Sequence, residues 1–278
     1  MNMNSKNSII LVDPDFDVDS ADNCDLLIKV TTDNFSYAII DRSKNCLMVL
    51  YDHQECKNVH SALSNLLKED RHFDLPFRTV KASVFTRNTI AIPNDLFDSQ
   101  KLNIYAKYFS TEQSEQLHLQ NLPGQEFTSI FNLDHRMEEL LITSFGISKV
   151  FDHTAPLIAL SNFVTEKHLT LDFTVGSFCA VLSDCGKLLF ENCYDTVDAE
   201  EFNYFLLLII HQLELDKQPI KVSLSGIIHE DDEKFKAIKQ YFNNIVFNIP
   251  NAEKLDNKIL DNMPNQYYSS LLAFRLCE

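Results

Sequence analysis

Two stretches of the chain repeat one pattern of apolar and polar positions. Residues 26–52 read LLIKVTTDNFSYAIIDRSKNCLMVLYD, and residues 168–194, about 142 positions later, read HLTLDFTVGSFCAVLSDCGKLLFENCY. Each stretch has three runs of β-branched, aromatic and aliphatic residues separated by short turns, which is typical of three consecutive antiparallel strands. An amphipathic helix and another strand are expected after each copy. The repeat therefore predicts an α/β protein with two related lobes and a cleft between them.

The expected boundaries follow from this repeat. Residues 1–24 are polar and acidic and are predicted to be a leader or a poorly fixed tail. The first lobe is expected over residues 25–166 and the second over residues 167–278. Within the first lobe, a β-rich insertion is expected at about residues 80–132.

Inside the insertion, one hairpin is expected to pair residues 80–86 with residues 89–92. A second hairpin is expected to pair residues 116–121 with residues 126–132. The segment between the two hairpins, residues 94–109, predicts a helix.

Three elements of the two lobes are predicted with their environment. The segment 133–145 predicts a helix that is capped near Asp134 and stopped by Gly146. The segment 200–213 is apolar nearly all round and predicts a buried helix. The fully apolar run 220–224 predicts a central parallel strand.

The composition favours a globular protein in the cytoplasm. The chain has 278 residues, of which 45% are hydrophobic, enough for an ordinary core. No apolar run approaches the roughly 20 residues that cross a bilayer, and the first residues lack the features of a secretion signal. Forty acidic residues against 24 basic ones give a net charge of −16, which repels phosphate backbones and anionic membranes. We therefore expect neither nucleic-acid binding nor membrane insertion.

The seven cysteines suggest a reducing compartment. They are odd in number and include no C-x-x-C pair and no zinc-type spacing with histidine. Neither a disulfide nor a metal site is expected. Cys179, Cys185 and Cys193 lie within 15 residues of one another, but they fall on predicted strands and turns, where packing is the expected role.

Glycine is scarce, and this excludes the common nucleotide-binding motifs. Only five glycines occur, and neither G-x-x-x-x-G-K-[ST] nor G-x-G-x-x-G is present. Phosphate-cradling loops need glycine because the backbone must approach the ligand closely. Histidines offer no clear alternative chemistry, since nothing places His53 and His60 on one face with Glu55. Ser225-Gly226 lacks the G-x-S-x-G context of a nucleophile.

Several segments resemble a known fold group. The segments LTLDFTVGSFCAVLSDCGKLLF, VSLSGIIHEDDEKFKAIKQYF and YYSSLLAFRLCE resemble the second lobe of the actin-like ATPase fold, as in the pilus-assembly protein PilM and the division protein FtsA. More closely, the chain from Leu26 onward resembles an uncharacterised bacterial family of unknown function assigned to that fold. The segments shared with this family are FTRNTIAIPNDLF, KLLFENCYDTVDAEEFNYFLL, SLSGII and the terminal LCE. The resemblance implies a two-lobed actin-like, ribonuclease H-like fold.

The resemblance also implies where a nucleotide would bind. In such ATPases the first turn of each meander wraps the phosphates, and acidic residues hold a hydrated Mg²⁺. In the first lobe, Lys29 or Val30 stands in the acidic place, depending on the register, and no glycine follows. The adenosine-contacting turn keeps only Gly226, followed by two isoleucines. The second lobe retains a partial set at these places: Asp172, Thr174, Gly176 and Ser177.

These departures predict a catalytically degenerate scaffold or protein-interaction module without catalytic residues or cofactor. The alternative is a nucleotide-binding switch or weak ATPase that holds ATP with Mg²⁺ through the retained set and Gly226. The expected partner is another protein, with a homodimer as a further option. The residues expected to form the interaction surface are aromatic ones in the inserted region: Phe85, Phe97, Tyr105 and Tyr108.

Overall fold

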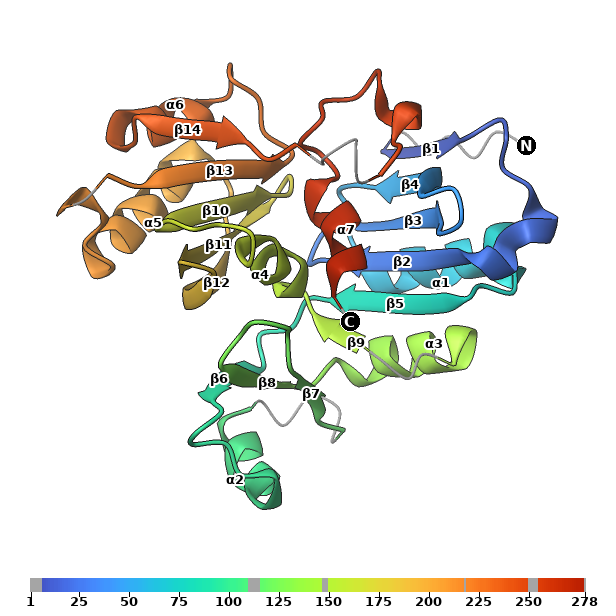
Figure 1. The fold of residues 1–278 in the computed structure, drawn as a ribbon, viewed down its shortest axis with the longest axis horizontal. Coiled ribbons are helices and arrows are strands. Elements are labelled where there is room, and N and C mark those ends of the chain that lie inside the picture. Colours follow the sequence, from blue (N-terminus) through green and yellow to red (C-terminus); the bar gives the residue numbers. More distant parts are fainter. Residues whose placement is uncertain (1–6, 110–115, 147–149, 218, 250–254, 278) are drawn as a thin grey trace.

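The computed structural model describes residues 7–109, 116–146, 150–217, 219–249 and 255–277. Its strands form three sheets (Figure 1). The first sheet has the order β1 (Ser8–Val12), β4 (Cys46–His53), β3 (Phe35–Asp41), β2 (Cys24–Val30), β5 (Thr79–Val84), β9 (Val150–Asp152). The second has the order β12 (Lys187–Asp195), β11 (Ser177–Asp184), β10 (His168–Phe173), β13 (Lys221–Gly226), β14 (Asn244–Phe247). The third has the order β6 (Thr89–Pro93), β8 (Phe127–Phe131), β7 (His118–Gln120).

The first two sheets share one arrangement. In each, three antiparallel strands form a meander, β2-β3-β4 or β10-β11-β12, and the first strand of the meander then pairs in parallel with a later strand. A further parallel strand, β9 or β14, follows at the edge. We call the first sheet with its helices the first lobe, and the second sheet with its helices the second lobe. The predicted meanders and the central parallel strand β13 are confirmed.

The middle of strand β2, Leu26–Ile28, is apolar because helices cover both faces of the first sheet. Side chains alternate between faces along a strand, so Leu26 and Ile28 pack with α1 (Val59–Glu69) and α3 (His135–Phe145). Leu27 points the other way and packs with α4 (Ala155–Ser161) and α7 (Ser269–Ala273). Figure 1 shows α1 behind this sheet and α7 in front of it.

Helix α3 ends as predicted. The Asp134 carboxylate accepts hydrogen bonds from the backbone N–H groups of Arg136 and Met137, and Gly146 closes the helix with a left-handed φ of 57°. In the second lobe, α5 (Ala199–Gln212) and α6 (Glu233–Tyr241) cover one face of the sheet. The expectation that α5 is buried all round is wrong, because Tyr204 and Leu207 on its outer side are 62% and 42% exposed.

Part of the expected leader is structured. Residues 1–6 lie outside the described residues, but β1 pairs antiparallel with β4 and extends the first sheet. The apolar run Ile9–Leu11 does not alternate between apolar and polar residues as a typical strand does. Its backbone nevertheless pairs with β4 along the whole of β1, because β4 would otherwise have an unpaired edge. A 3₁₀ turn, Val18–Asn23, then leads directly into β2.

The inserted region is smaller than predicted, because β5 does not form a hairpin with β6. Strand β5 lies between β2 and β9 in the first sheet, whereas β6 pairs with β8 in the third sheet. The hairpin of β7 with β8 is confirmed. The predicted helix over 94–109 is wrong: within it only α2 (Leu102–Tyr105) is α-helical, flanked by the 3₁₀ turns Ser99–Lys101 and Ala106–Tyr108. The Asp98 side chain instead caps the turn that begins at Ser99, and none of the residues in these three turns is buried, so no core supports a longer helix.

The expectation of no disulfide is also wrong, because Cys179 and Cys193 are bonded. The two residues are direct partners on the antiparallel strands β11 and β12. Their separation of 14 residues therefore becomes a cross-strand contact that spacing alone does not reveal. Among the helices of the described residues, none is both long and apolar enough to span a bilayer.

Candidate functional site

The first turns of the two meanders meet between the lobes. Lys29 pairs with Ser36 across β2 and β3, and Asp172 pairs with Cys179 across β10 and β11. Each pair is the last but one of its ladder, so Lys29 and Asp172 hold equivalent positions in the two meanders. The structure thus decides the register that the sequence left open: Lys29, and not Val30, occupies the position that corresponds to the acidic residue Asp172.

Lys29 and Asp172 form a buried ion pair. The Lys29 Nζ atom lies 2.6 Å from Asp172 Oδ2 and donates a second hydrogen bond of 2.6 Å to Ser270 Oγ. The Ser225 hydroxyl donates to the other carboxylate oxygen, Asp172 Oδ1, at 2.7 Å. The side chains of Lys29 and Asp172 are only 11% and 6% exposed. Both buried charges are therefore compensated by protein groups.

The second contact between the meanders involves Asp33 in the turn after β2. Its Oδ2 atom accepts hydrogen bonds from the backbone N–H of Gly176 at 2.9 Å and from the Thr174 hydroxyl at 3.2 Å. The hydroxyls of Thr174 and Ser177 lie 2.8 Å apart and share a hydrogen bond. The Asp33 carboxylate thus binds the hydrogen-bond donors that, by the resemblance to actin-like ATPases, would bind a phosphate group.

Gly226 has a structural role in the contact between β10 and β13. It pairs with Phe173, has φ +77°, and a Cβ atom on it would lie 2.0 Å from the Phe173 carbonyl oxygen. Its backbone N–H donates to the Gln266 carbonyl at 3.0 Å. The close approach of two backbones therefore explains this glycine without a nucleotide.

A third carboxylate, Asp52 of β4, lies in the same interface. Burial raises its pKa to about 6, although hydrogen bonds from Gln54 and Tyr268 oppose the shift. Gln54 Nε2 lies 2.8 Å from both carboxylate oxygens. The neutral acid is therefore the main form of Asp52 only below about pH 6.

The structure brings the five predicted nucleotide-binding residues together but leaves little space among them. Three of them, Asp172, Thr174 and Gly226, line a cavity with Lys29, Asp52 and Tyr268 that has a volume of about 20 Å³. Ligand sites are typically about 300–1,000 Å³, and one water occupies about 30 Å³ of the liquid. This cavity by itself has no room for a nucleotide.

Sequence reasoning missed Asp33, Asp52, Ser225 and Ser270 as parts of this interface. Superposing the two repeats would have found one of them, because Asp33 and Gly176 are separated by the same 143 residues as Lys29 and Asp172. Ser270 has no such signal, since it comes from α7 and reaches Lys29 only in the folded chain.

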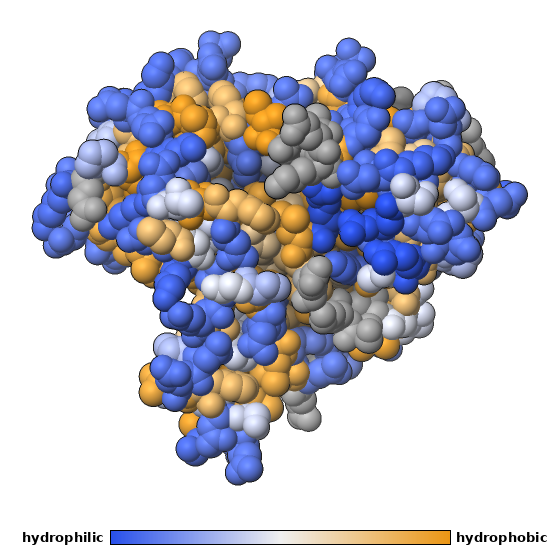
Figure 2. Space-filling model, in the orientation of Figure 1, coloured by the Kyte–Doolittle hydropathy of each residue, from blue (hydrophilic) through white to orange (hydrophobic). Residues whose placement is uncertain are grey.

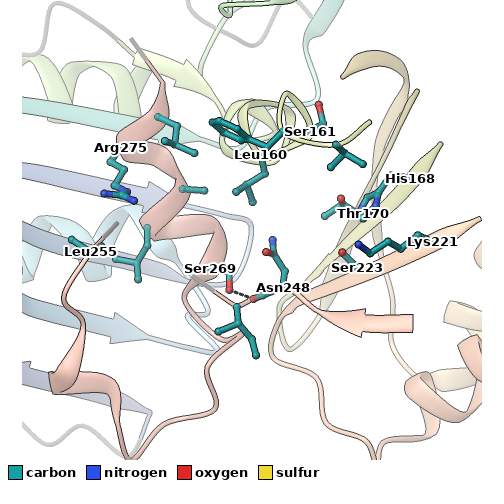
Figure 3. A pocket seen from close by; sticks show the side chains of 16 residues that line it. Leu160, Ser161, His168, Thr170, Lys221, Ser223, Asn248, Leu255, Ser269 and Arg275 are labelled. Atoms are coloured by element: carbon teal, nitrogen blue, oxygen red, sulfur yellow. Dashed lines mark hydrogen bonds between the residues drawn. The ribbon is translucent and has the colours of Figure 1, made fainter. Parts of the chain in front are cut away.

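A different cavity, of about 300 Å³, lies at the other ends of β10 and β13 (Figure 3). Figure 3 shows His168, Thr170, Lys221 and Ser223 on one wall, with Leu160 of α4 and Arg275 beyond α7 on the other walls. None of the described residues that line it is acidic. His168 is 4% exposed, its Nδ1 has no hydrogen-bond partner, and burial together with Lys221 lowers its pKa to about 4.

The four candidate interaction residues do not lie together. Phe85 follows β5 and packs on the His153 ring at 4.7 Å between the lobes. Phe97 and Tyr105 stack at 6.3 Å in the inserted region, while Tyr108 is 78% exposed. Figure 2 shows apolar side chains on this projecting region, and the large exposed ones at α2 and its flanks are Leu96, Ile104 and Tyr108.

Comparison with known proteins places the fold. The family model described as "Protein of unknown function (DUF3822)" matches residues 13–245. A Bacteroides thetaiotaomicron protein with an actin-like ATPase fold and unknown function is similar with a TM-score of 0.76 and 17% identity, covering 95% of this chain and 99% of that chain. No curated protein matches.

Two further structures share the fold. A chain of the PilM–PilN type IV pilus biogenesis complex is similar with a TM-score of 0.55 and 12% identity, covering 91% of this chain and 98% of that chain. The ethanolamine utilization protein EutJ from Carboxydothermus hydrogenoformans has a TM-score of 0.52 and 8% identity, covering 96% and 93%. The predicted actin-like ATPase fold is confirmed.

Proposed function

The chain belongs to the DUF3822 family, and we propose that it is a catalytically degenerate actin-fold protein that acts in the cytoplasm by binding another protein. The observation that carries this proposal is the ion pair of Lys29 with Asp172. It places a fixed positive charge on the one carboxylate of the second meander that could hold a hydrated Mg²⁺. An ammonium at that point repels the metal ion.

The contact of Asp33 supports the same proposal. A triphosphate entering the cleft would have to displace the Asp33 carboxylate from Gly176 and Thr174. It would also approach the carboxylates of Asp33 and Asp52 at close range, and like charges repel strongly where water is excluded. These contacts therefore favour the arrangement in which the two lobes bind each other directly over one in which a nucleotide lies between them.

Thermal unfolding tests this part of the proposal. The purified full chain is heated with and without millimolar Mg-ATP, Mg-ADP and Mg-GTP, because a ligand that binds only the native state raises the midpoint by mass action. We expect no shift with any of them and no phosphate release from ATP. A shift, or a hydrolysis rate that disappears in Thr174→Val, would overturn the proposal and favour the nucleotide switch.

We propose that the partner binds the inserted region at Leu96, Ile104 and Tyr108. These side chains are 72%, 44% and 78% exposed, and Figure 1 shows α2 projecting away from both lobes. Exposed apolar groups gathered on one projection favour a protein contact. The pilus protein of similar fold occurs in a complex with PilN, so the fold is compatible with such a role.

A photo-crosslinking amino acid at position 108 tests this surface in cells, with position 197 as the control because Val197 is 93% exposed but lies in the second lobe. We expect a defined crosslinked product from position 108 alone. The identified partner is then purified, and Leu96→Asp is expected to weaken binding at least about tenfold, whereas Val197→Asp is not. Equal crosslinking from both positions would contradict the assigned surface.

The shared strand order of the two lobes also supports an origin by internal duplication. Two of the contacts between the lobes, Lys29 with Asp172 and Asp33 with Gly176, have the same spacing of 143 residues, so each joins a residue to its counterpart. We therefore infer that the cleft lost its nucleotide chemistry by changes at equivalent positions: a lysine for an acid, and an aspartate for a glycine.

A further inference from the structure

A second group of reactive side chains lies away from the Lys29 cleft. Cys179 and Cys193 are direct partners on β11 and β12, and their sulfur atoms are bonded. The Nε2 atom of His153, which follows β9 of the first lobe, lies 3.0 Å from Cys193 Sγ. A histidine from one lobe thus contacts a cysteine of the other lobe.

The surroundings of His153 fix its ring in this position. The residue is 7% exposed, its Nδ1 atom lies 3.4 Å from the Asp152 carboxylate, and Phe85 packs on the ring at 4.7 Å. The Nε2 atom is therefore within hydrogen-bond reach of the Cys193 sulfur and can take up its proton when the cysteine is reduced, which leaves a thiolate. A cysteine thiolate is the form that attacks other sulfur atoms.

The two cysteines differ in their access to solvent-borne reagents. Cys193 and His153 both line a cavity of about 520 Å³ between the lobes, together with Arg87, Tyr194 and Asp195, whereas Cys179 does not line it. Both cysteines are half-buried. A reagent that enters the cavity therefore meets Cys193 first and has His153 beside it.

We propose that Cys193 is a reactive thiol which, with Cys179 as its resolving partner, forms a thiol–disulfide exchange site for low-molecular-weight disulfides. Starting from the reduced pair, the Cys193 thiolate attacks one sulfur of the disulfide. A bond forms between Cys193 Sγ and that sulfur while the reagent's own S–S bond breaks, and the departing thiolate takes the proton of His153.

In the second step, Cys179 loses its proton to His153 or to water and attacks Cys193 Sγ. The mixed disulfide breaks, the second small thiolate leaves and is protonated, and the Cys179–Cys193 bond remains. Two protein thiols are oxidised and one small disulfide is reduced to two thiols, so electrons and protons balance. A dithiol reductant reverses the sequence.

The other cysteines provide internal controls. Cys185 is exposed and Cys24 and Cys277 are buried. Burial raises the pKa of Cys24 to about 11 and that of Cys277 to about 12, so neither is expected to react. Cys185 is more accessible than Cys193, and accessibility alone would make it the faster thiol.

The test uses the full chain after reduction and removal of the reductant. Oxidised glutathione is added, samples are trapped with N-ethylmaleimide at intervals, and peptide mass mapping follows each cysteine. We expect Cys193 to react at least about tenfold faster than Cys185. The wild type should end as the Cys179–Cys193 disulfide, whereas Cys179→Ser should stop at the Cys193–glutathione adduct.

His153→Asn should slow the modification of Cys193 about tenfold or more while Cys185 keeps its rate, and the exposed His135→Asn should change neither. Circular dichroism of each variant shows that the fold is kept. If Cys193 reacts no faster than Cys185, the cysteines only pack.

The three ligand atoms of His153, Cys179 and Cys193 also lie within 4.8 Å of one another. Stoichiometric Zn²⁺ binding by the reduced protein that protects Cys193 from glutathione would therefore replace the exchange site with a metal site.

Discussion

Lys29 and Asp172 occupy equivalent positions in the two meanders, 143 residues apart, and their side chains bind each other at 2.6 Å. This contact joins the first strand of one meander to the first strand of the other. The pair therefore links the two lobes directly.

Removing one member of the pair should destabilise the protein strongly. Lys29→Met leaves the Asp172 charge buried without its partner, and such changes cost about 3–5 kcal/mol. Urea unfolding followed by circular dichroism measures the loss. The double variant Lys29→Met with Asp172→Leu should recover most of it, and Lys236→Met, which breaks the exposed pair with Glu233, should leave the midpoint unchanged. Equal effects of Lys29→Met and Lys236→Met would contradict a buried pair.

Two glycines of similar backbone conformation should respond differently to alanine. Gly226→Ala would place a Cβ atom 2.0 Å from the Phe173 carbonyl oxygen, whereas Gly146→Ala meets nothing within 4 Å. We expect Gly146→Ala to cost about 1–2 kcal/mol for its left-handed φ. Gly226→Ala should cost roughly 3 kcal/mol or more, because the backbone must also move. Denaturant unfolding of both variants compares them, and similar losses would show that β10 and β13 pack less closely than described.

The stability of the fold should depend on pH through His168. Its pKa is about 4 in the native protein, below the usual 6.5, because burial and Lys221 disfavour the charged form. Between these two pH values the unfolded chain binds more protons than the native protein. The free energy of unfolding is therefore highest above about pH 6.5 and decreases as the pH falls toward 4. The difference in thermal midpoint between wild type and His168→Gln, measured across pH 4–7, should show this slope. A thermal midpoint that differs by the same amount at every pH would contradict the buried position of His168.

The apolar side chains of the inserted region should contribute little to stability. Leu96→Ser and Tyr108→Ser remove groups that are 72% and 78% exposed, so each should change the free energy of unfolding by less than about 0.5 kcal/mol. Phe131→Ala, in the buried β8 of the same region, should cost about 3–5 kcal/mol. Urea unfolding checks all three, and a large loss from Tyr108→Ser would mean that this side chain packs and is no docking surface.

The sequence predicted the two meanders and their arrangement because each local signal agreed with the global one. Turn residues, alternating positions and the apolar run of β13 all favour the same strands. The failures lie where pairing is decided at a distance. The short separation of β5 and β6 in the sequence predicts a hairpin, but β5 pairs in parallel with β2 and β9 inside the larger sheet.

The site was predicted in part for a similar reason. Asp172, Thr174, Gly176 and Ser177 lie around the end of one strand, so their proximity could be foreseen. The groups of the other lobe that bind them come from far away in the sequence: Lys29 binds Asp172, and Asp33 binds Gly176 and Thr174. The local sequence around a charged residue does not indicate which charged residue of the other lobe it will contact.

Helix α7 has a consequence for how the chain is made. It packs on Leu27 and Ala38 of the first lobe, as does the 3₁₀ turn Phe274–Leu276 that follows it. During synthesis from the N-terminus, α4 can cover its part of this face of the first sheet, but the part under α7 stays uncovered until about 230 later residues have left the ribosome. The nascent first lobe is therefore an incompletely covered sheet, and truncation of the chain before Ser269 would make that condition permanent.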